Sequence, residues 1–214
     1  TTRRYSSAAS DVYKRQGGHS PAIICEDANI ETAANILVGT KFRNAGQICI
    51  SPSRFLVHKK VYEKFLNLFV AKVRSIKVGN GLEDDIKMGP LIHEKRLQTI
   101  EKLVKDAVDR GANIVTGGKR IGNKGYFFEP TVLTEVSKDS KLMNEEPFGP
   151  LAPILSFDHL DDALDEANRI EYGLAAYVYT NNLKVAQELG SNIESGQISI
   201  CLLYTSPSPR DPNR

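Results

Sequence analysis

The chain has 214 residues, and its 28 Lys and Arg residues almost balance its 26 Asp and Glu residues, which gives a formal net charge of +2. So small a charge argues against a basic surface that binds nucleic acid or an anionic membrane, and no apolar run approaches the roughly 20 residues that a membrane helix needs. Three cysteines are too few for a disulfide framework and favour a reducing compartment, so we expect a cytoplasmic location.

Residues 1–16 and 201–214 differ in character from the rest of the chain. The stretch DVYKRQ (11–16) can be back-translated so that its reverse complement, read one base on, encodes CLLYTS (201–206). Both segments also resemble read-through of the two adapters of a transposase-cut DNA library. We therefore interpret them as non-native tails and take 17–200 as the protein of interest. The tails hold six of the basic and two of the acidic residues, so the remainder carries a formal charge of −2.

Between these tails, short apolar runs alternate with stretches of helical periodicity. Residues 21–25 form an apolar run that predicts a buried strand, and Asn29 can cap the helix that follows it. That helix continues until the polar turn at 44–47 breaks it. Residues 54–58 then predict a strand, and 62–76 predict an amphipathic helix.

The second half of the chain repeats this alternation. Residues 95–110 predict a long helix that Gly111 closes, and 127–136 read as an extended segment. The other predicted elements are a strand and turn at 113–118, a strand at 151–157, a helix at 160–168, a strand at 175–180, a helix at 183–189 and a strand at 196–200. Alternating strands and helices predict βαβ units on a largely parallel sheet, and therefore an α/β fold in one domain.

The stretch KFRNAGQIC (41–49) ends in a cysteine that follows a helix and a polar turn. A thiol just beyond such a turn can lie near free backbone N–H groups in a cleft, where the thiolate would attack a carbonyl carbon. The N–H of Cys49 itself could help to hold the developing oxyanion. The alternative is that Cys49 is a small buried apolar residue, as most free cysteines are. Cys25 lies inside an apolar strand, and we expect it to be structural.

The stretch NEEPFGPLAPI (144–154) places Glu145 and Glu146 before a turn that Pro147 and Pro150 make rigid. An acid held there, at the entrance of a buried strand, could accept hydrogen bonds from the hydroxyl groups of a ribose. The alternative, which the spacing alone favours, is a solvated acidic pair beside a β-turn.

Other patterns in the sequence do not indicate a functional site. The stretch GNGLED (79–84) lacks the third glycine of a dinucleotide-binding loop and reads as a turn. No arrangement of Ser, His and Asp suggests a catalytic triad. We also predict no metal site, because no metal-ligand spacing relates the four histidines, His19, His58, His93 and His159.

Two of these motifs, FRNAGQIC and EEPFGPLAPI, together resemble the aldehyde dehydrogenase superfamily. The resemblance covers 17–200 and includes the stretches GGHSPAIICEDANIETA, GLEDDIKMGPLI and EYGLAAYVYT. Within the superfamily, KFRNAGQIC, GPLAPI and YGLAAYVYT are most similar to the succinate-semialdehyde dehydrogenase branch. The resemblance implies a three-layer α/β catalytic domain, truncated at both ends, from an enzyme that oxidises an aldehyde to a carboxylate with NAD or NADP.

By matching position, the resemblance makes Cys49 the catalytic thiol, which attacks the aldehyde to give a thiohemiacetal and, after hydride transfer, a thioester. Glu146 matches the glutamate that hydrogen-bonds the nicotinamide ribose, and Phe148 matches the aromatic residue that packs by the nicotinamide ring. Asn44 and Gln47 match residues that shape the turn carrying the thiol. The glycine pair that follows the family's general-base glutamate, also assigned to the cofactor site, is Gly17 and Gly18.

The chain departs from the family pattern in three places. Arg15 and Gln16 stand where the family has Glu-Leu before the glycine pair, so the general base is missing, and we attribute this to truncation. The resemblance places most of the cofactor domain, with the oxyanion-hole asparagine, upstream, and the oligomerisation hairpin downstream. Ser51 occupies the position of a second cysteine that serves some semialdehyde relatives as a redox switch, so we expect no such switch.

The resemblance implies a small-molecule aldehyde as substrate, with succinic semialdehyde as the first candidate, and a homodimer or homotetramer as the full-length parent. Two alternatives stay open for the chain as written, because general base and cofactor domain are missing. Cys49 could serve a cysteine-dependent esterase or thioesterase, or the chain could be an inert binding or structural module.

Overall fold

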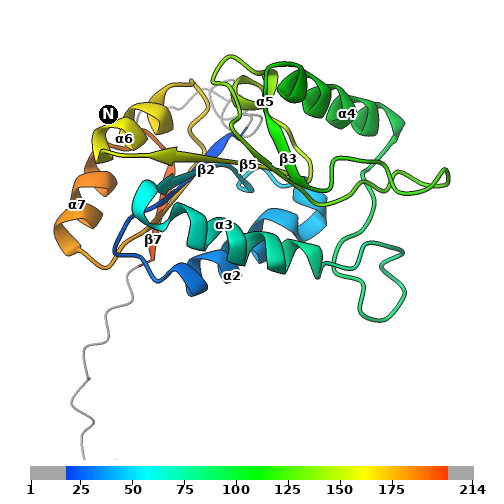
Figure 1. Ribbon diagram of the computed structural model, residues 1–214, viewed down its shortest axis with the longest axis horizontal. Coiled ribbons are helices and arrows are strands. Elements are labelled where there is room, and N and C mark those ends of the chain that lie inside the picture. Colours follow the sequence, from blue (N-terminus) through cyan, green and yellow to red (C-terminus); the bar gives the residue numbers. More distant parts are fainter. Residues whose placement is uncertain (1–17, 202–214) are drawn as a thin grey trace, which may run out of the picture.

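Seven strands form one sheet in the computed structural model, which describes residues 18–201 (Figure 1). The strands lie in the order β3-β4-β5-β2-β1-β6-β7, and the edge pair β3–β4 is antiparallel while all other pairs are parallel. The strands span Ser20–Ile24 (β1), Pro52–His58 (β2), Asn113–Thr116 (β3), Thr131–Thr134 (β4), Leu151–Phe157 (β5), Ala175–Tyr179 (β6) and Gln197–Cys201 (β7). The predicted α/β fold with a largely parallel sheet is therefore confirmed.

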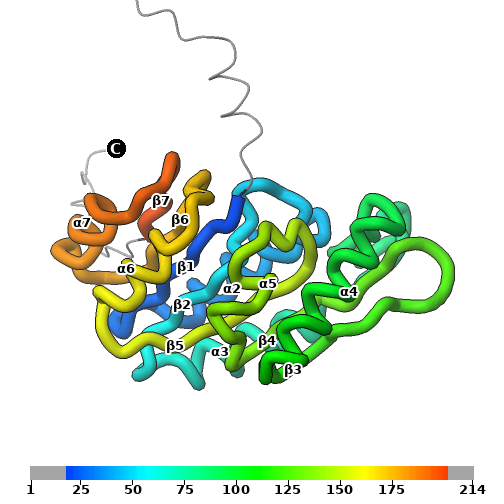
Figure 2. Tube along the Cα trace, turned by 90° about the horizontal axis from the view of Figure 1, so that it is seen from above, coloured from blue at the N-terminus to red at the C-terminus, as the bar shows by residue number. Residues whose placement is uncertain are grey.

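Helices cover both faces of this sheet, so the implied three-layer arrangement is confirmed as well. In Figure 1, α2 and α3 lie below the sheet, and α4, α5 and α6 lie above it. The helices span Ile30–Phe42 (α2), Lys59–Arg74 (α3), Glu94–Asp109 (α4), Lys141–Asn144 (α5), Leu160–Asn168 (α6) and Leu183–Asn192 (α7). In the view from above, β1 and β2 lie in the centre of the fold, between β5 on one side and β6 on the other (Figure 2).

The two faces of the sheet bury separate sets of apolar side chains. Ile24 of β1 joins a core that also holds Leu37 of α2, whereas Ile23 joins a second core with Ala163 of α6. Successive side chains of a strand point to opposite faces. Because both faces are covered by helices, residues 21–25 read as a continuous apolar run rather than an alternating one.

The predicted helices occur, with small differences at their ends. The predicted cap of α2 is confirmed, because Asn29 Oδ1 accepts a hydrogen bond from the Thr32 N–H at 3.0 Å. Helix α3 begins earlier than predicted, at Lys59, since His58 serves as its cap: His58 Nδ1 accepts from the Lys60 N–H at 3.3 Å. None of the helices in the described part of the chain is long and apolar enough to cross a membrane.

The last strand continues one residue past the boundary predicted for the native segment. Cys201, assigned from the sequence to a tail, pairs with Tyr179 at the end of β7. Residues 1–17 and 202–214 lie outside the described residues. The interpretation of the two tails as non-native therefore stays a prediction.

The sheet brings three distant segments together at one of its edges. Strands β1, β2 and β5 are parallel neighbours, so their amino ends lie side by side. Gly18 precedes β1, Cys49 precedes β2 and Glu146 precedes β5. These residues belong to the three sequence motifs that carry the predicted chemistry.

Candidate active site

The turn that carries Cys49 has an unusual backbone conformation. Asn44, Ala45 and Gly46 all have positive φ angles, of 52°, 53° and 70°, and three left-handed residues in succession end α2 abruptly. The side chains of Asn44 and Gln47 hold this turn. Asn44 Nδ2 donates to the Gln47 carbonyl and Gln47 Nε2 donates to the Asn44 carbonyl, both at 3.1 Å.

Gly46 brings the two sequence motifs into direct contact. A Cβ atom at Gly46 would lie 2.2 Å from the carbonyl oxygen of Gly149, so a side chain has no room there. Gln47 makes a further tie, because its Oε1 accepts from the Ile92 N–H at 2.9 Å. The turn that carries Cys49 therefore packs backbone to backbone on the turn formed by 147–150.

Gly18, Cys49 and Glu146 meet at the amino edge of the sheet. The N–H of Gly18 donates to Oε1 of Glu146 at 2.9 Å. The Gly18 backbone also packs on Cys49, since a Cβ atom at Gly18 would lie 1.8 Å from the Cys49 carbonyl oxygen. Three of the predicted site residues are thus in contact, whereas Gly17 lies outside the described residues.

The two cysteines predicted to differ have different surroundings. Cys49 is exposed, which excludes the alternative of a buried apolar residue. Within 18–201, the N–H of Cys49 donates to no other backbone group, so it is able to donate a hydrogen bond to an oxyanion. Cys25 is buried, and burial, with the nearby Asp27 charge, raises the pKa of its thiol to about 12. A thiol with so high a pKa is unreactive at neutral pH.

Phe148 lies in the same turn as Glu146 and is held in a strained conformation. Its φ angle is 40°, in the left-handed region that favours glycine. The Arg96 guanidinium carbon lies 5.5 Å from the centre of the Phe148 ring, and Arg96 Nη1 donates to the Pro147 carbonyl at 3.5 Å. A cation–π contact and a hydrogen bond from α4 thus fix the position of this ring.

A cavity of about 320 Å³ lies beside the turn that carries Cys49. Ile48 and Ile50, the two neighbours of Cys49, line it together with residues of α2 such as Ile36. Arg43 is the single charged side chain among the described residues that line this cavity. This cavity therefore has a partly apolar wall with one cation, and it is lined by the sequence neighbours of Cys49.

Tyr177 of β6 contacts Ile50, the residue after Cys49, and the sequence alone did not indicate this contact. Its hydroxyl donates to the Ile50 carbonyl at 2.6 Å. Burial raises the pKa of Tyr177, and the neighbouring Cys49 sulfur raises it further. The phenol therefore stays neutral and donates to the turn. The motif EYGLAAYVYT contained this residue, but aromatic residues in strands are most often core, so the pattern alone gave no functional signal.

Lys41 is a buried charge in the last turn of α2. Its side chain is 1% exposed, and its carbonyl accepts from the Ser51 hydroxyl at 3.3 Å. Burial lowers the pKa of Lys41 to about 7, and the negative charge of Glu146 partly opposes that shift. Sequence reasoning missed Lys41 as well. The available signal was its spacing of four residues from Leu37, which places it on the buried face of the helix.

His19 is a neutral histidine in the core. Nε2 lies 3.0 Å from the Leu142 carbonyl, which can only accept, so Nε2 carries the proton. Nδ1 then accepts from the Ser53 hydroxyl at 2.7 Å. Burial, and next the Arg54 charge, lower the pKa of His19 to about 3. Within 18–201, no group of three or more His, Cys, Asp or Glu side chains could hold a metal ion.

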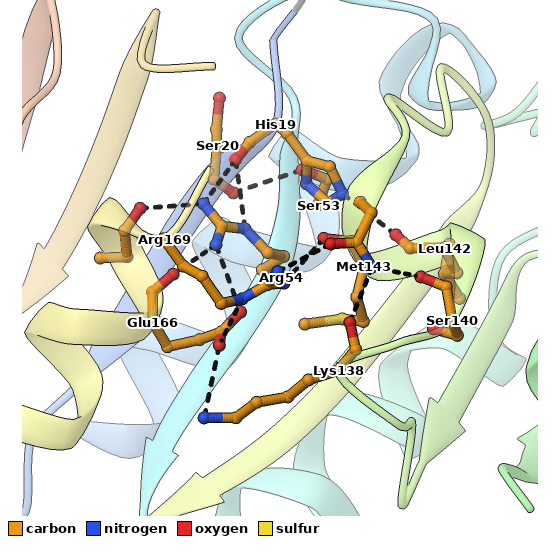
Figure 3. A network of polar contacts seen from close by, with 12 residues as sticks. His19, Ser20, Ser53, Arg54, Lys138, Ser140, Leu142, Met143, Glu166 and Arg169 are labelled. Carbon is orange, nitrogen blue, oxygen red and sulfur yellow. Dashed lines mark hydrogen bonds and ion pairs between the residues drawn. The ribbon is translucent and has the colours of Figure 1, made fainter. Parts of the chain in front are cut away.

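Arg54 of β2 is fully buried at the centre of a polar network (Figure 3). Its Nη2 donates to the carbonyls of His19 and Ala167, both at 3.0 Å, and its Nη1 lies 3.4 Å from Glu166 Oε1. Burial lowers the pKa of Arg54 to about 10, and the paired Glu166 carboxylate opposes this shift. Because each donor has an acceptor, the network joins β1, β2 and α6 without an unpaired charge.

The same network reaches the segment that leads to Glu146. Arg169, whose Nε donates to Glu166 Oε2 at 2.9 Å, also donates to Asn144 Oδ1 at 2.7 Å and to the Met143 carbonyl at 3.1 Å (Figure 3). These contacts hold α5, and α5 ends directly before the acid pair. The buried charges therefore fix the position from which Glu146 reaches Gly18.

An exposed thiol thus follows a strained turn at the amino edge of a largely parallel α/β sheet, where Gly18 contacts both Cys49 and the Glu146 carboxylate. The family described as "Aldehyde dehydrogenase family" matches residues 3–208, and the chain belongs to this family. The match extends into both segments that we interpret as tails.

Several curated relatives resemble the chain over most of its length. A protein of Sinorhizobium fredii named "Probable succinate-semialdehyde dehydrogenase [NADP(+)]" is 46% identical over 184 residues, which cover 86% of this chain and 38% of the relative. The lactaldehyde dehydrogenase of Escherichia coli is 38% identical over 199 residues, 91% of this chain and 42% of the relative. The chain thus spans about two fifths of the length of these relatives.

Solved structures show the same fold. The crystal structure of lactaldehyde dehydrogenase from Escherichia coli has a TM-score of 0.84 and 38% identity, and the match covers 86% of this chain and 39% of that one. The structure titled "3,6-anhydro-L-galactose Dehydrogenase in Complex with NAP" also has a TM-score of 0.84, with 41% identity and coverage of 86% and 39%. The described residues therefore correspond to part of an aldehyde dehydrogenase.

Proposed function

We propose that this chain is the nucleophile-bearing segment of a longer NAD(P)-dependent aldehyde dehydrogenase. The observation that carries the proposal is the meeting of Gly18, Cys49 and Glu146 at the amino edge of the sheet. The thiolate of Cys49 attacks the aldehyde carbon to form a thiohemiacetal, and the oxyanion is held by the N–H of the same residue. Loss of hydride leaves a thioester, and attack by water releases the carboxylate.

The residues beside the thiol suit a nicotinamide cofactor, which when bound accepts the hydride. One oxygen of Glu146 takes the Gly18 N–H at 2.9 Å, and a carboxylate can accept several more hydrogen bonds from ribose hydroxyls. The Phe148 ring, fixed by Arg96, gives an apolar surface for a flat ring. The base that activates water is expected at the position that Arg15 occupies in this sequence, which lies outside the described residues. We assign no preference between NAD and NADP.

The cavity lined by the sequence neighbours of Cys49 favours an aldehyde that carries a carboxylate. Its wall is mainly apolar around Ile48 and Ile50, and Arg43 gives it one positive charge. A short aliphatic chain would lie along the apolar wall, and a terminal carboxylate would pair with the guanidinium. Succinic semialdehyde has this chemistry, and several relatives carry its name.

The test is aldehyde-dependent reduction of NAD⁺ and NADP⁺ by the full-length enzyme that contains this segment. We expect succinic semialdehyde to be oxidised with a higher kcat/KM than butanal, and Arg43→Met to lower that ratio by about tenfold or more. Mass spectrometry of a quenched reaction should find the acyl group on Cys49. Turnover without acylation of Cys49 would refute the proposal.

A cysteine-dependent esterase is the second candidate for the chain as written, because Cys49 is exposed and its N–H can hold an oxyanion. Cleavage of an activated aryl ester that stops after alkylation of Cys49 would support it. We expect little activity, since an esterase also needs a base for hydrolysis of the acyl-enzyme.

We further propose that the full-length enzyme is a cytoplasmic homodimer or homotetramer. The edge strands β3 and β7 each pair with one neighbour within 18–201, so each has an edge on which another strand can add. Light scattering after size-exclusion chromatography measures the oligomeric state, and a monomer would contradict this proposal.

A further inference from the structure

A second cavity adjoins the first, and its lining includes three positively charged side chains. Its volume is about 420 Å³, and it shares Asn35, Gly39 and Arg43 with the first cavity. Lys72 from α3 and Lys87 from the following loop complete its charged lining. We call this cavity the basic groove.

Among the described residues, no carboxylate neutralises the three positive charges of the basic groove. Its lining contains no carboxylate, and within 18–201 none of Arg43, Lys72 and Lys87 has an acidic oxygen within 4.0 Å. Asp85 is close in sequence to Lys87, but it pairs with Lys77 at 3.4 Å. Three like charges around one concavity raise the local concentration of anions.

The backbone holds these cations in place. The N–H groups of Lys87 and Met88 donate to the Lys77 carbonyl at 3.0 and 3.2 Å, and the Gly79 N–H donates to the Met88 carbonyl at 3.1 Å. Met88 is 1% exposed and anchors this loop in the core. Lys72 belongs to the last turn of α3. The fold therefore sets the backbone positions from which Lys72 and Lys87 project.

We propose that the basic groove is an outer binding site for carboxylate anions, through which a carboxylate-bearing aldehyde enters and the dicarboxylate product leaves. This inference rests on the substrate class of the proposed function. Oxidation converts a monoanionic aldehyde into a dianion, so the groove attracts the product more strongly than the substrate. Arg43 stands where the two cavities meet and passes the carboxylate from one to the other.

The test compares two double variants of the full-length enzyme that remove the same charge. Lys72→Gln with Lys87→Gln changes the groove, whereas Lys64→Gln with Lys102→Gln removes two exposed lysines of α3 and α4 that do not line it. We expect the groove variant to lower kcat/KM for succinic semialdehyde by about three- to tenfold at about 0.01 M salt, and the loss to vanish near about 1 M. Butanal, which is neutral, should be oxidised equally by both variants.

Calorimetric titration with succinate tests the groove without turnover, and inorganic phosphate shows whether a carboxylate is required. Weaker succinate binding in the groove variant than in the control variant supports the proposal, and an equal loss for phosphate would overturn its carboxylate specificity. Equal succinate binding by both variants would overturn the groove itself while leaving aldehyde oxidation through Cys49 intact. Absence of any aldehyde oxidation by the unsubstituted enzyme would instead refute the proposed function.

Discussion

The two ends of the central strands differ in character, although the same strands connect them. At the amino ends, Gly18, Cys49 and Glu146 meet and leave a thiol exposed. At the carboxyl ends, Cys25 and His58 line a separate cavity of about 280 Å³. Open parallel sheets usually bind ligands outside the carboxyl ends of their strands. In this chain the candidate chemistry lies at the opposite end.

The polar groups at the carboxyl edge are engaged with one another. Asp27 accepts from the Thr180 hydroxyl at 2.9 Å and from the Asn181 N–H at 2.8 Å, and Glu26 pairs with Lys60. The bonds of Asp27 hold the loop after β1 against the loop after β6, and the Glu26–Lys60 pair ties the same loop to α3. The comparison teaches that a cavity with charged walls is not by itself a catalytic site, because catalysis also needs an exposed nucleophile and acceptors with spare capacity.

The largest expected effect is the loss of aldehyde turnover when Cys49, but not Cys25, is replaced. In the full-length enzyme, Cys49→Ala should lower aldehyde turnover by at least about a thousandfold, because the nucleophile is lost. Cys25→Ala should leave turnover within about twofold and lower stability by about 1 kcal/mol, since it removes only a buried sulfur atom. Steady-state kinetics and chemical denaturation measure both effects.

Alkylation offers an independent check of the same contrast. Iodoacetamide should modify Cys49 in the native protein and reach Cys25 only after denaturation, as mass spectrometry of peptides would show. Modification of native Cys25 at a comparable rate would mean that the carboxyl edge is open and that the comparison is wrong.

The next largest expected effect is a loss of stability, which tests the backbone contact between Gly18 and Cys49 at the amino edge. Gly18→Ala should destabilise the domain by at least about 3 kcal/mol, because the added Cβ would meet the Cys49 carbonyl, a backbone atom that cannot rotate away. Gly81→Ala is the matched control, since a Cβ there meets no atom within 4 Å. Urea denaturation compares the two, and equal stabilities would disprove the contact.

The sequence predicted the elements well because apolar periodicity and caps are local signals. The apolar run before Asn29 and the capped helix after it occur as expected. That Cys49 and Glu146 belong to one site was implied only by the resemblance of their two motifs to the aldehyde dehydrogenase superfamily. The spacing of Glu145 and Glu146 alone favoured a solvated acid pair. Their contact through Gly18 depends on strand order, which periodicity does not encode.

The buried charges could not be predicted, because their partners are distant in the chain. Arg54 lies in a strand of seven residues and pairs with Glu166, which is more than a hundred positions away in the sequence. Lys41 falls on the apolar face of α2, where a lysine would ordinarily argue against burial. Only the packed fold shows which charges are compensated.

A smaller effect is expected in the pH dependence of stability, and it arises from His19 at the amino edge of the sheet. The folded pKa of His19 is about 3, below the ordinary value of 6.5. Between these two values the unfolded chain binds a proton that the folded chain does not, so stability falls as the pH is lowered. From pH 6.5 to 4.5 we expect His19 to contribute a loss of about 2 kcal/mol.

Two glutamine variants isolate this contribution. His19→Gln should lose this part of the pH dependence, whereas His159→Gln, at an exposed position of the carboxyl edge, should keep it. Denaturation curves across this pH range measure the difference between each variant and the unsubstituted protein. Equal pH profiles for the two variants would show that His19 takes up a proton in the folded state.

The smallest expected effect concerns the charge of Glu146. In Glu146→Gln the amide oxygen still accepts the Gly18 N–H, so the fold stays intact while the negative charge toward the cofactor is lost. We expect the KM for the nicotinamide cofactor to rise by about three- to tenfold with little change in stability. Cofactor titrations of the full-length enzyme measure this.

Glu145→Gln is the control, because the neighbouring acid is exposed and is not the carboxylate that accepts from Gly18. It should leave the cofactor KM unchanged. An equal rise in both variants would assign the effect to the general negative charge of the acid pair. An unchanged KM in Glu146→Gln would make its bond to Gly18 purely structural, and the amino edge would then owe its function to the thiol alone.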